Sequence, residues 1–159
     1  MAVPDDLDAT ARRDAVLAQF HRLGMRRTAA RGAVIEAMLA TPHQSAAQLH
    51  AHIRDRGLPI DLSSVHRIVE AFTAAGLAHA LPTPTGTTYG LADRPHHHAV
   101  CTTCGHVREL PADELTSAID LIIRTTGQPL PANRPGHGIV LYGPCPTCAP
   151  HTADQPVPT

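Results

Sequence analysis

Four cysteines in two C-x-x-C pairs are the residues of this chain that point most directly to chemistry. The first pair is Cys101 and Cys104, and the second is Cys145 and Cys148. Each pair can bring two thiolates onto one ion, and two pairs complete the tetrahedral sulfur set that is typical of structural zinc. Because such a set leaves no position for water, we expect a structural Zn²⁺ and not a catalytic one. The alternative is a redox dithiol or a set of free thiols.

A run of three histidines, His96, His97 and His98, stands immediately before the first cysteine pair in a chain that contains 12 histidines. If this run is an extended strand, His96 and His98 point to one side and His97 points to the other. One run can therefore supply imidazoles to two separate metal sites. The alternative is a solvated polar turn, and the neighbouring cysteine pair favours the metal sites.

The composition indicates small domains with weak cores. The chain has 159 residues, and its 3% of aromatic residues leave alanine, leucine, valine and isoleucine to build the core. Small domains of this kind commonly need a metal or a partner subunit for stability. The formal charge is only −1, yet residues 9–31 carry six arginines and a single aspartate. This local excess favours a nucleic-acid contact, and the alternative is a solvated basic face.

The sequence contains neither the apolar run of a membrane-spanning segment nor the pattern of a signal peptide. We find no run of about 20 apolar residues, and the start of the sequence lacks the charged and apolar regions of a signal peptide. We therefore expect a cytoplasmic protein without a membrane partner. In that reducing compartment, paired cysteines are metal ligands more often than disulfides.

The first half of the chain predicts four short helices. Apolar spacing places them at about residues 7–23, 29–40, 46–56 and 63–75. Thr28 and Ser45 are suitable N-caps for the second and third helices, and Ser63 or Asp61 for the fourth. Two strands joined by the turn at residues 82–86 follow directly. Helices followed by a hairpin predict a winged helix-turn-helix domain over residues 1–91.

The rest of the chain predicts a second, different unit. Residues 92–95 have the composition of a hinge. Strands are expected near residues 98–101, 107–110 and 137–142, with a helix over residues 113–126. The predicted fold class is therefore α+β, with a small α/β dimerisation and metal-binding domain over residues 96–149. Residues 150–159 are rich in proline and are expected to be a disordered tail.

Together, these motifs resemble the ferric uptake regulator family of bacterial metal-dependent repressors, over about residues 10–150, with the zinc-sensing subgroup as the best match. The matching features are Gly24-Met-Arg26-Arg27-Thr28, Arg31, Ser45, Leu49, Leu62, Val65, Arg67, Gly76-Leu77, Tyr89, the histidine run, both cysteine pairs and His137. The resemblance implies a winged-helix domain that binds operator DNA, a β-rich domain that forms a homodimer, and a regulatory metal near the hinge.

The resemblance also assigns a regulatory metal site residue by residue. It matches His43, His96, His98 and Glu109 to the regulatory ligands of the family, and His79 to a position used by zinc-sensing members. Imidazole and carboxylate ligands suit Zn²⁺, Fe²⁺ or Ni²⁺. We expect Zn²⁺, because His79 is present and Gly90 stands where iron sensors and peroxide sensors commonly carry an acid.

A second inter-domain metal site is matched less completely. Pro95 replaces the first histidine of the usual run of four, and the usual helix acid is missing. The remaining candidates for this site are His97, His137 and Glu114. Zinc sensors also often carry a cysteine in the stretch between the hairpin and the hinge, and none is found here.

The expected DNA contacts come from the arginine-rich segment and from the fourth helix, which is matched to the recognition helix. Short polar and cationic groups there suit phosphates and base edges. The family usually has tyrosine in place of His66, and glutamine in place of Ala30. The predicted DNA-binding residues are Arg26, Arg27, Arg31, Ser63, Ser64, His66 and Arg67.

The sequence thus predicts a dimeric, zinc-responsive repressor that controls metal-homeostasis genes and has neither enzymatic activity nor a small-molecule substrate. Iron or nickel sensing within the same family is the first alternative. A zinc hydrolase that uses His96, His98 and Glu109 is a second, but the H-E-x-x-H motif is missing. A metal-buffering protein is a third, and it leaves the helix-turn-helix unexplained.

Overall fold

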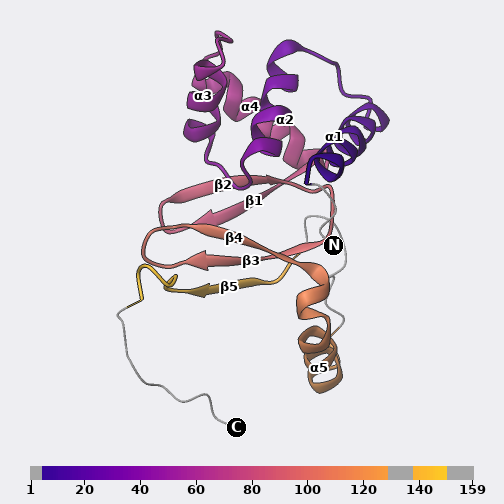
Figure 1. The fold of residues 1–159 in the computed structure, drawn as a ribbon, viewed down its shortest axis with the longest axis vertical. Helices are drawn as coiled ribbons and strands as arrows, with labels where there is room; N and C mark the ends of the chain where they lie inside the picture. Colours follow the sequence, from indigo (N-terminus) through magenta and orange to yellow (C-terminus); the bar gives the residue numbers. More distant parts are fainter. Residues whose placement is uncertain (1–4, 129–137, 150–159) are drawn as a thin grey trace.

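Four helices and a hairpin form the N-terminal part of the molecule in the computed structural model, which describes residues 5–128 and 138–149. The elements are α1 (Asp5–Arg22), α2 (Ala29–Ala40), α3 (Ala46–Asp55), α4 (Leu62–Ala74), β1 (Ala78–Thr83) and β2 (Gly86–Leu91). Their order is the one expected for a winged helix-turn-helix. Figure 1 shows the helices gathered above the hairpin.

The helices begin at the capping residues that the sequence predicts. The Thr28 side chain accepts a hydrogen bond from the Arg31 backbone N–H at the start of α2. Ser45 and Gln48 form a reciprocal capping box at the start of α3. Of the two candidates for α4, the cap is Asp61, whose carboxylate accepts from the Ser64 backbone N–H at 2.7 Å. Each cap satisfies backbone donors that the helix itself leaves unpaired.

Aliphatic side chains build the N-terminal core. Phe20 of α1 and Phe72 of α4 meet edge to face, with ring centroids 6.1 Å apart. The other members with relative exposure of at most 2% are Val16, Val34, Ile35, Ala37, Met38, Leu49, Ile53, Val65, Val69, Leu77 and Leu91. The core therefore places α4 against the other helices and leaves the outer face of α4 to solvent.

The loop before α3 is joined to the hairpin by a short backbone bridge. The Gln44 N–H donates to the Tyr89 carbonyl at 3.3 Å, and the Tyr89 N–H donates to the Gln44 carbonyl at 2.8 Å. Within the hairpin, His79 lies directly opposite Gly90. These pairings hold the residues around position 43 beside the end of β2.

The C-terminal part is a three-stranded sheet with one helix. Its elements are β3 (His96–Cys101), β4 (Val107–Pro111), η1 (Ala112–Leu115), α5 (Thr116–Thr126) and β5 (Val140–Gly143). The central strand β3 pairs antiparallel with β4 and parallel with β5. The helix expected over residues 113–126 begins with a 3₁₀ turn and becomes α-helical at Thr116. Of the strand expected over residues 137–142, the first residue lies outside the described part, and so does the predicted tail at 150–159.

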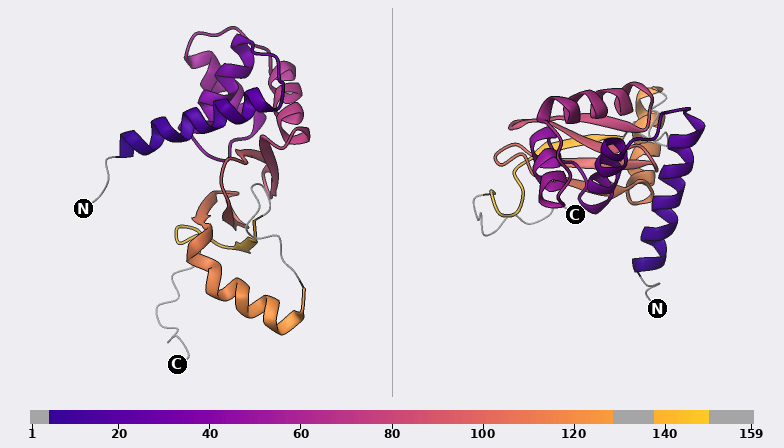
Figure 2. Two further views of the ribbon diagram at one scale, coloured as in Figure 1. Left: turned by 90° about the vertical axis from the view of Figure 1, so that its right-hand side faces the viewer. Right: turned by 90° about the horizontal axis from the view of Figure 1, so that it is seen from above.

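The C-terminal part has a much smaller core than the N-terminal part. Its buried apolar residues in the described ranges are Val100, Cys101 and Ile119. The large apolar side chains that stay exposed are Leu121, Ile122, Leu141 and Tyr142. Figures 1 and 2 show α5 extending away from the sheet, at the end of the molecule opposite the N-terminal helices. Every helix in the described ranges is too short or too polar to cross a lipid bilayer.

Candidate metal centres

The two cysteine pairs meet at one point, although 41 residues separate Cys104 from Cys145. The end of β3 supplies Cys101, the turn after β3 supplies Cys104, and the turn after β5 supplies Cys145 and Cys148. All four Sγ atoms lie within 4.8 Å of one another, and Cys104 Sγ is 4.0 Å from Cys145 Sγ. Zn–S bonds of about 2.3 Å in a tetrahedron place sulfurs about 3.8 Å apart. The cluster therefore fits a four-sulfur zinc ion.

Backbone amides donate hydrogen bonds to the sulfur of Cys101, the first cysteine of this cluster. Cys101 Sγ accepts N–H donors from Cys104 and Cys145 and a third from Thr103, at 3.2 to 3.4 Å. These donors lower the pKa of the Cys101 thiol below its ordinary value, because they stabilise the thiolate. A thiolate is the form of cysteine that binds metal. All four cysteines are free of disulfide bonds.

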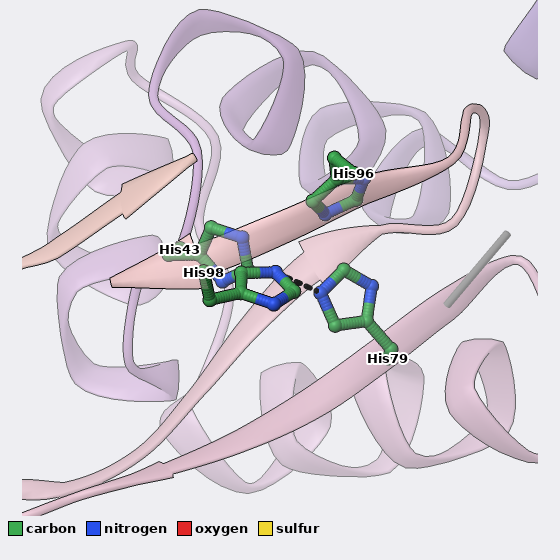
Figure 3. Close-up of side chains that lie close together, drawn as sticks. All are labelled: His43, His79, His96 and His98. Atoms are coloured by element: carbon green, nitrogen blue, oxygen red, sulfur yellow. Dashed lines mark hydrogen bonds between the residues drawn. The ribbon is translucent and has the colours of Figure 1, made fainter. Parts of the chain in front are cut away.

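A second cluster joins four histidines from both parts of the molecule, as Figure 3 shows. His43 comes from the loop between α2 and α3, His79 from β1, and His96 and His98 from β3. One ring nitrogen from each lies within 4.8 Å of the other three, and His79 Nε2 is 3.1 Å from His98 Nε2. Zn–N bonds of about 2.1 Å in a tetrahedron separate nitrogens by about 3.4 Å.

The imidazoles are buried, and their hydrogen bonding suits metal ligation. The four residues are at most 8% exposed, and five of their ring nitrogens have no hydrogen-bond partner in the described part of the chain. Buried polar atoms without a partner are rare in folded proteins. His96 Nδ1 is 2.9 Å from the Arg94 carbonyl and must donate to it, so its Nε2 keeps the lone pair that a metal needs. The cluster fits a bound cation.

Glu109 of β4 lies at the edge of the histidine cluster. Its Oε1 is 3.3 Å from His43 Nε2 and 3.8 Å from His96 Nε2. Its other oxygen, Oε2, is 3.4 Å from Arg94 Nη2. The structure thus brings all five predicted regulatory residues together, with the carboxylate between two imidazoles and a guanidinium.

The environment keeps two of the imidazoles neutral and the carboxylate charged. Burial, together with the neighbouring His43 and His96, lowers the pKa of His79 to about 4 and of His98 to about 3. Burial by itself raises the pKa of Glu109, but the neighbouring imidazoles of His43 and His96 outweigh it and lower that pKa to about 2. Neutral imidazoles and an ionised carboxylate are the metal-binding forms of these groups.

These pKa values predict that acid destabilises the metal-free protein. An unfolded histidine has a pKa of about 6.5, whereas His79 and His98 titrate near 4 and 3 in the folded chain. The unfolded chain therefore binds more protons between these values, and the free energy of unfolding falls as the pH drops from about 6.5 toward 3. Urea unfolding of the metal-free protein at pH 7 and pH 5 measures this fall.

The matched variant is His98→Gln, which removes one of these two buried imidazoles. We expect its free energy of unfolding to change less between pH 7 and pH 5 than that of the unmodified chain. Above pH 5, Glu109 stays ionised in both states, because its folded pKa is about 2 and the ordinary value is about 4.3. An equal pH dependence in both proteins would contradict the prediction.

His97 points away from this cluster, as the alternation of side chains along a strand predicts. It is fully buried, and its Nδ1 accepts the Ile139 backbone N–H at 3.1 Å. An imidazole that accepts at Nδ1 carries its proton on Nε2 when neutral, so Nε2 has no free lone pair in this arrangement. The other two residues of the predicted second site, His137 and the side chain of Glu114, lie outside the described part. This second site therefore stays a prediction.

The predicted DNA-binding residues lie in the segment before α2, at the start of α2 and on α4. Arg26, Arg27, Ser63, His66 and Arg67 are exposed, while Arg31 and Ser64 are half-buried. Arg31 Nη1 donates to the Arg26 carbonyl at 2.9 Å, which fixes its guanidinium beside the start of α2. On α4, the side chains of both His66 and Arg67 are exposed to solvent.

Asp61 accepts more hydrogen bonds in the first turn of α4 than an N-cap residue alone requires. Its carboxylate accepts hydrogen bonds from the Ser63 hydroxyl, the Ser64 hydroxyl and the Ser64 backbone N–H. Arg67 Nη2 in turn donates to Ser64 Oγ at 3.1 Å. The Ser63 and Ser64 bonds hold the pKa of Asp61 well below its ordinary value. The two serines predicted to contact DNA are thus already hydrogen-bonded, and Ser64 positions Arg67.

Three residues near the histidine cluster were not predicted from the sequence to take part in the site. Arg94 supplies the carbonyl that orients His96 and the guanidinium near Glu109. Asp93 accepts from the Arg12 guanidinium at 2.7 Å and ties α1 to the segment between the hairpin and β3. Gly90 touches the ring of His43. Arg94 and Asp93 adjoin the histidine run, which is a usable signal, whereas nothing local marks Gly90 as a neighbour of His43.

A winged helix-turn-helix followed by a small sheet that carries a histidine cluster and a cysteine cluster defines a class of metal-responsive DNA-binding regulators. The chain belongs to the ferric uptake regulator family, whose profile matches residues 22–131. Members of this family are metal-responsive transcription regulators.

Curated relatives of the chain include iron and zinc regulators. A zinc uptake regulation protein of Mycobacterium tuberculosis is 31% identical over 129 residues, which cover 79% of this chain and 95% of that protein. A ferric uptake regulation protein of Neisseria meningitidis is 29% identical over 111 residues, which cover 69% of this chain and 74% of the relative. These relatives show the family without distinguishing the metal.

Solved structures show the same fold. The ferric uptake regulator of Vibrio cholerae matches with a TM-score of 0.62 and 27% identity, over 79% of this chain and 96% of that one. The ferric uptake regulator of Helicobacter pylori matches with a TM-score of 0.68 and 19% identity, over 91% of this chain and 96% of that one. The latter structure is described as having three functional metal-binding sites.

Proposed function

We propose that this chain is a zinc-responsive repressor that binds operator DNA as a metal-loaded homodimer in the cytoplasm and controls metal-homeostasis genes. The proposed ligands of the regulatory zinc are His43, His79, His96, His98 and Glu109. The proposed ligands of a structural zinc are the four cysteines described above. The proposal contains no enzymatic step, because the members of the matched family are transcription regulators.

The main support for this proposal is that the four buried imidazoles come from two different parts of the chain. His43 and His79 belong to the helical and hairpin part, whereas His96 and His98 belong to the sheet. A bound Zn²⁺ can accept one lone pair from each of the four imidazoles. The four rings then fix the position of the helices relative to the sheet, so the arrangement that holds metal is favoured over other arrangements. If this arrangement also binds operator DNA best, metal and DNA support each other's binding.

Zinc is favoured over iron and nickel by the donors at this site. Four imidazoles and a single carboxylate form a nitrogen-rich set, which suits borderline cations. Gly90 contributes no side-chain oxygen donor in the hairpin. Fe²⁺ and Ni²⁺ accept the same ligands and are therefore compared directly with Zn²⁺ in the experiment below.

The domain roles follow the boundaries predicted from the sequence. We assign DNA binding to residues 1–91, the hinge to residues 92–95, and dimerisation and metal binding to residues 96–149. The exposed apolar side chains of α5 and β5 support dimerisation, because Leu121 is 60% exposed and Tyr142 is 57% exposed. A second copy of the chain would remove this apolar surface from water.

Arg67 is the DNA contact with the clearest expected effect. It is exposed on α4, and Ser64 holds its guanidinium. If Arg67 reads a base edge, Arg67→Ala lowers the operator affinity of the zinc-loaded protein by about 1–3 kcal/mol, or roughly 5- to 150-fold. Arg67→Lys keeps the charge but loses the bidentate geometry, so it should restore only the salt-dependent part. Equal affinity of Arg67→Ala and the unmodified chain would contradict this role.

The decisive experiment is fluorescence anisotropy with a DNA duplex selected from a random pool by the zinc-loaded protein. Free Zn²⁺, Fe²⁺ and Ni²⁺ are set by metal buffers, and Fe²⁺ is handled without oxygen. We expect Zn²⁺ to raise DNA affinity by about 5- to 150-fold, the usual range for allosteric coupling. The expected result also requires that Fe²⁺ and Ni²⁺ act only at higher free concentrations.

The other outcomes are equally informative. Stronger activation by Fe²⁺ or Ni²⁺ would reassign the effector metal within the family. DNA binding that ignores all three metals would overturn the regulatory role. Uptake of many zinc ions per chain without any DNA binding would indicate a metal-buffering protein instead.

A further inference from the structure

An ion pair between Arg12 and Asp93 joins helix α1 to the segment that leads from the hairpin into β3. Arg12 Nε donates to Asp93 Oδ2 at 2.7 Å, and Arg12 Nη2 donates to Asp93 Oδ1 at 3.3 Å. The two side chains are only 18% and 6% exposed, although 81 positions separate them in the sequence. Two N–H···O bonds from one guanidinium fix the orientation of a carboxylate as well as its distance. The pair therefore holds this segment against α1.

The segment held in this way leads directly into the histidine cluster. The Ala92 N–H donates to the Leu77 carbonyl at 2.9 Å, which fixes the start of the segment on the N-terminal part. At its other end, the Arg94 carbonyl accepts from His96 Nδ1 at 2.9 Å and orients that ring. Only three peptide bonds separate Asp93 from His96, so the position of Asp93 limits where His96 can lie.

The neighbouring residue of α1 forms a pair of a different kind. Arg13 Nε donates to Glu36 Oε1 at 2.7 Å, so this pair joins α1 to α2 within the helical part. Its side chains are far more exposed than those of Arg12 and Asp93. Exposed ion pairs contribute little to stability, whereas removing one partner of a buried pair leaves an uncompensated charge. Of the two pairs, only Arg12–Asp93 reaches the segment before β3.

We propose that the Arg12–Asp93 pair sets the free zinc concentration at which the regulatory site fills. This proposal rests on the proposed function, because it assumes that the histidine cluster binds the regulatory metal. The pair forms without metal and favours the arrangement in which the helical part and β3 bring their imidazoles together. A site whose binding arrangement is more populated before the ligand arrives has a higher apparent affinity. Arg12 and Asp93 are therefore positioning residues that act through His96.

This role has a distinct signature in the binding equilibria. Without the pair, the metal-binding arrangement is rarer in the metal-free protein, so the zinc affinity and the metal-free DNA affinity fall by the same factor. Saturating zinc restores the arrangement, and the DNA affinity then equals that of the unmodified chain. General damage to the fold would instead lower the DNA affinity at every zinc concentration.

The test compares Arg12→Met, Asp93→Asn and the double variant in the full chain, with its cysteine site filled with zinc. Competition with a chromophoric chelator measures the zinc affinity of the histidine cluster. We expect each variant to bind zinc about 2- to 30-fold more weakly, the usual effect of a residue that changes coupling from outside the ligand set. The double variant should lose no more than either single variant, because each change removes the same pair.

Arg13→Met is the matched control, because it removes the neighbouring guanidinium of the same helix. Its zinc affinity should equal that of the unmodified chain. Arg12→Lys keeps the charge but not the two-bond geometry, so its zinc affinity should lie between those of Arg12→Met and the unmodified chain. Hydrogen exchange of the Ala92 amide in the metal-free proteins needs no zinc: it should be faster in Arg12→Met and unchanged in Arg13→Met.

Two results would overturn the proposal. One is equal zinc affinity of Arg12→Met and the unmodified chain. The other is a DNA affinity of Asp93→Asn that stays reduced at saturating zinc. Failure of the proposed function looks different. In that case the unmodified chain binds zinc at the histidine cluster, the variants bind it more weakly, and DNA affinity does not respond to zinc in any of these proteins.

Discussion

Replacing Cys145 by serine is expected to release zinc from the cysteine cluster and to unfold the three-stranded sheet. This sheet has little else to hold it, because its buried apolar residues in the described ranges are Val100, Cys101 and Ile119. The cluster also links the end of β3 to the turn after β5, far apart in the sequence. Structural zinc contributes about 10–16 kcal/mol of apparent binding free energy in small domains. We therefore expect the free energy of unfolding of this part to fall by at least about 5 kcal/mol.

Two measurements check this effect. The zinc content should fall by one ion per chain, and amide hydrogen exchange should lose protection in β3, β4 and β5 while α1 to α4 keep theirs. Thr147→Ala is the matched control, because Thr147 lies in the same turn and is exposed. If Cys145→Ser keeps both the zinc and the protection of the sheet, the cysteine cluster is not a structural zinc site.

Replacing His96 by alanine is expected to abolish the proposed stimulation of DNA binding by zinc while leaving the proposed homodimer intact. His96 is 4% exposed, and its Nε2 is one of the buried ring nitrogens without a hydrogen-bond partner among the described residues. The Arg94 carbonyl orients the ring so that Nε2 faces the other imidazoles of the cluster. Operator affinity in the presence of zinc should fall by about 5- to 150-fold, to the metal-free value.

A zinc titration followed by gel shift measures this loss, and sedimentation reports the oligomeric state. His106→Ala is a suitable control, because His106 is an exposed histidine of the neighbouring turn and lies outside the cluster. It should respond to zinc like the unmodified chain. An unchanged response of His96→Ala would remove this residue from the regulatory site.

Local rules explain why much of the fold could be predicted. Helix starts depend on side chains that cap their own backbone, so Thr28, Ser45 and Asp61 could be recognised from their positions alone. Strand alternation is also local, and it separates His97 from His96 and His98 as predicted. The two cysteine pairs were recognisable because residue type and spacing together specify a metal ligand set. The two turns lie together in space, as a shared four-sulfur metal site requires.

The sequence alone determined the order of the elements, the cysteine pairs and the histidine run, because each depends on neighbours within a few residues. Only the tertiary structure decided which atoms meet across long separations. It placed His43 against Gly90, and it placed the Arg12 guanidinium against the Asp93 carboxylate. Such contacts arise from backbone pairing and packing between distant segments, which no local pattern records.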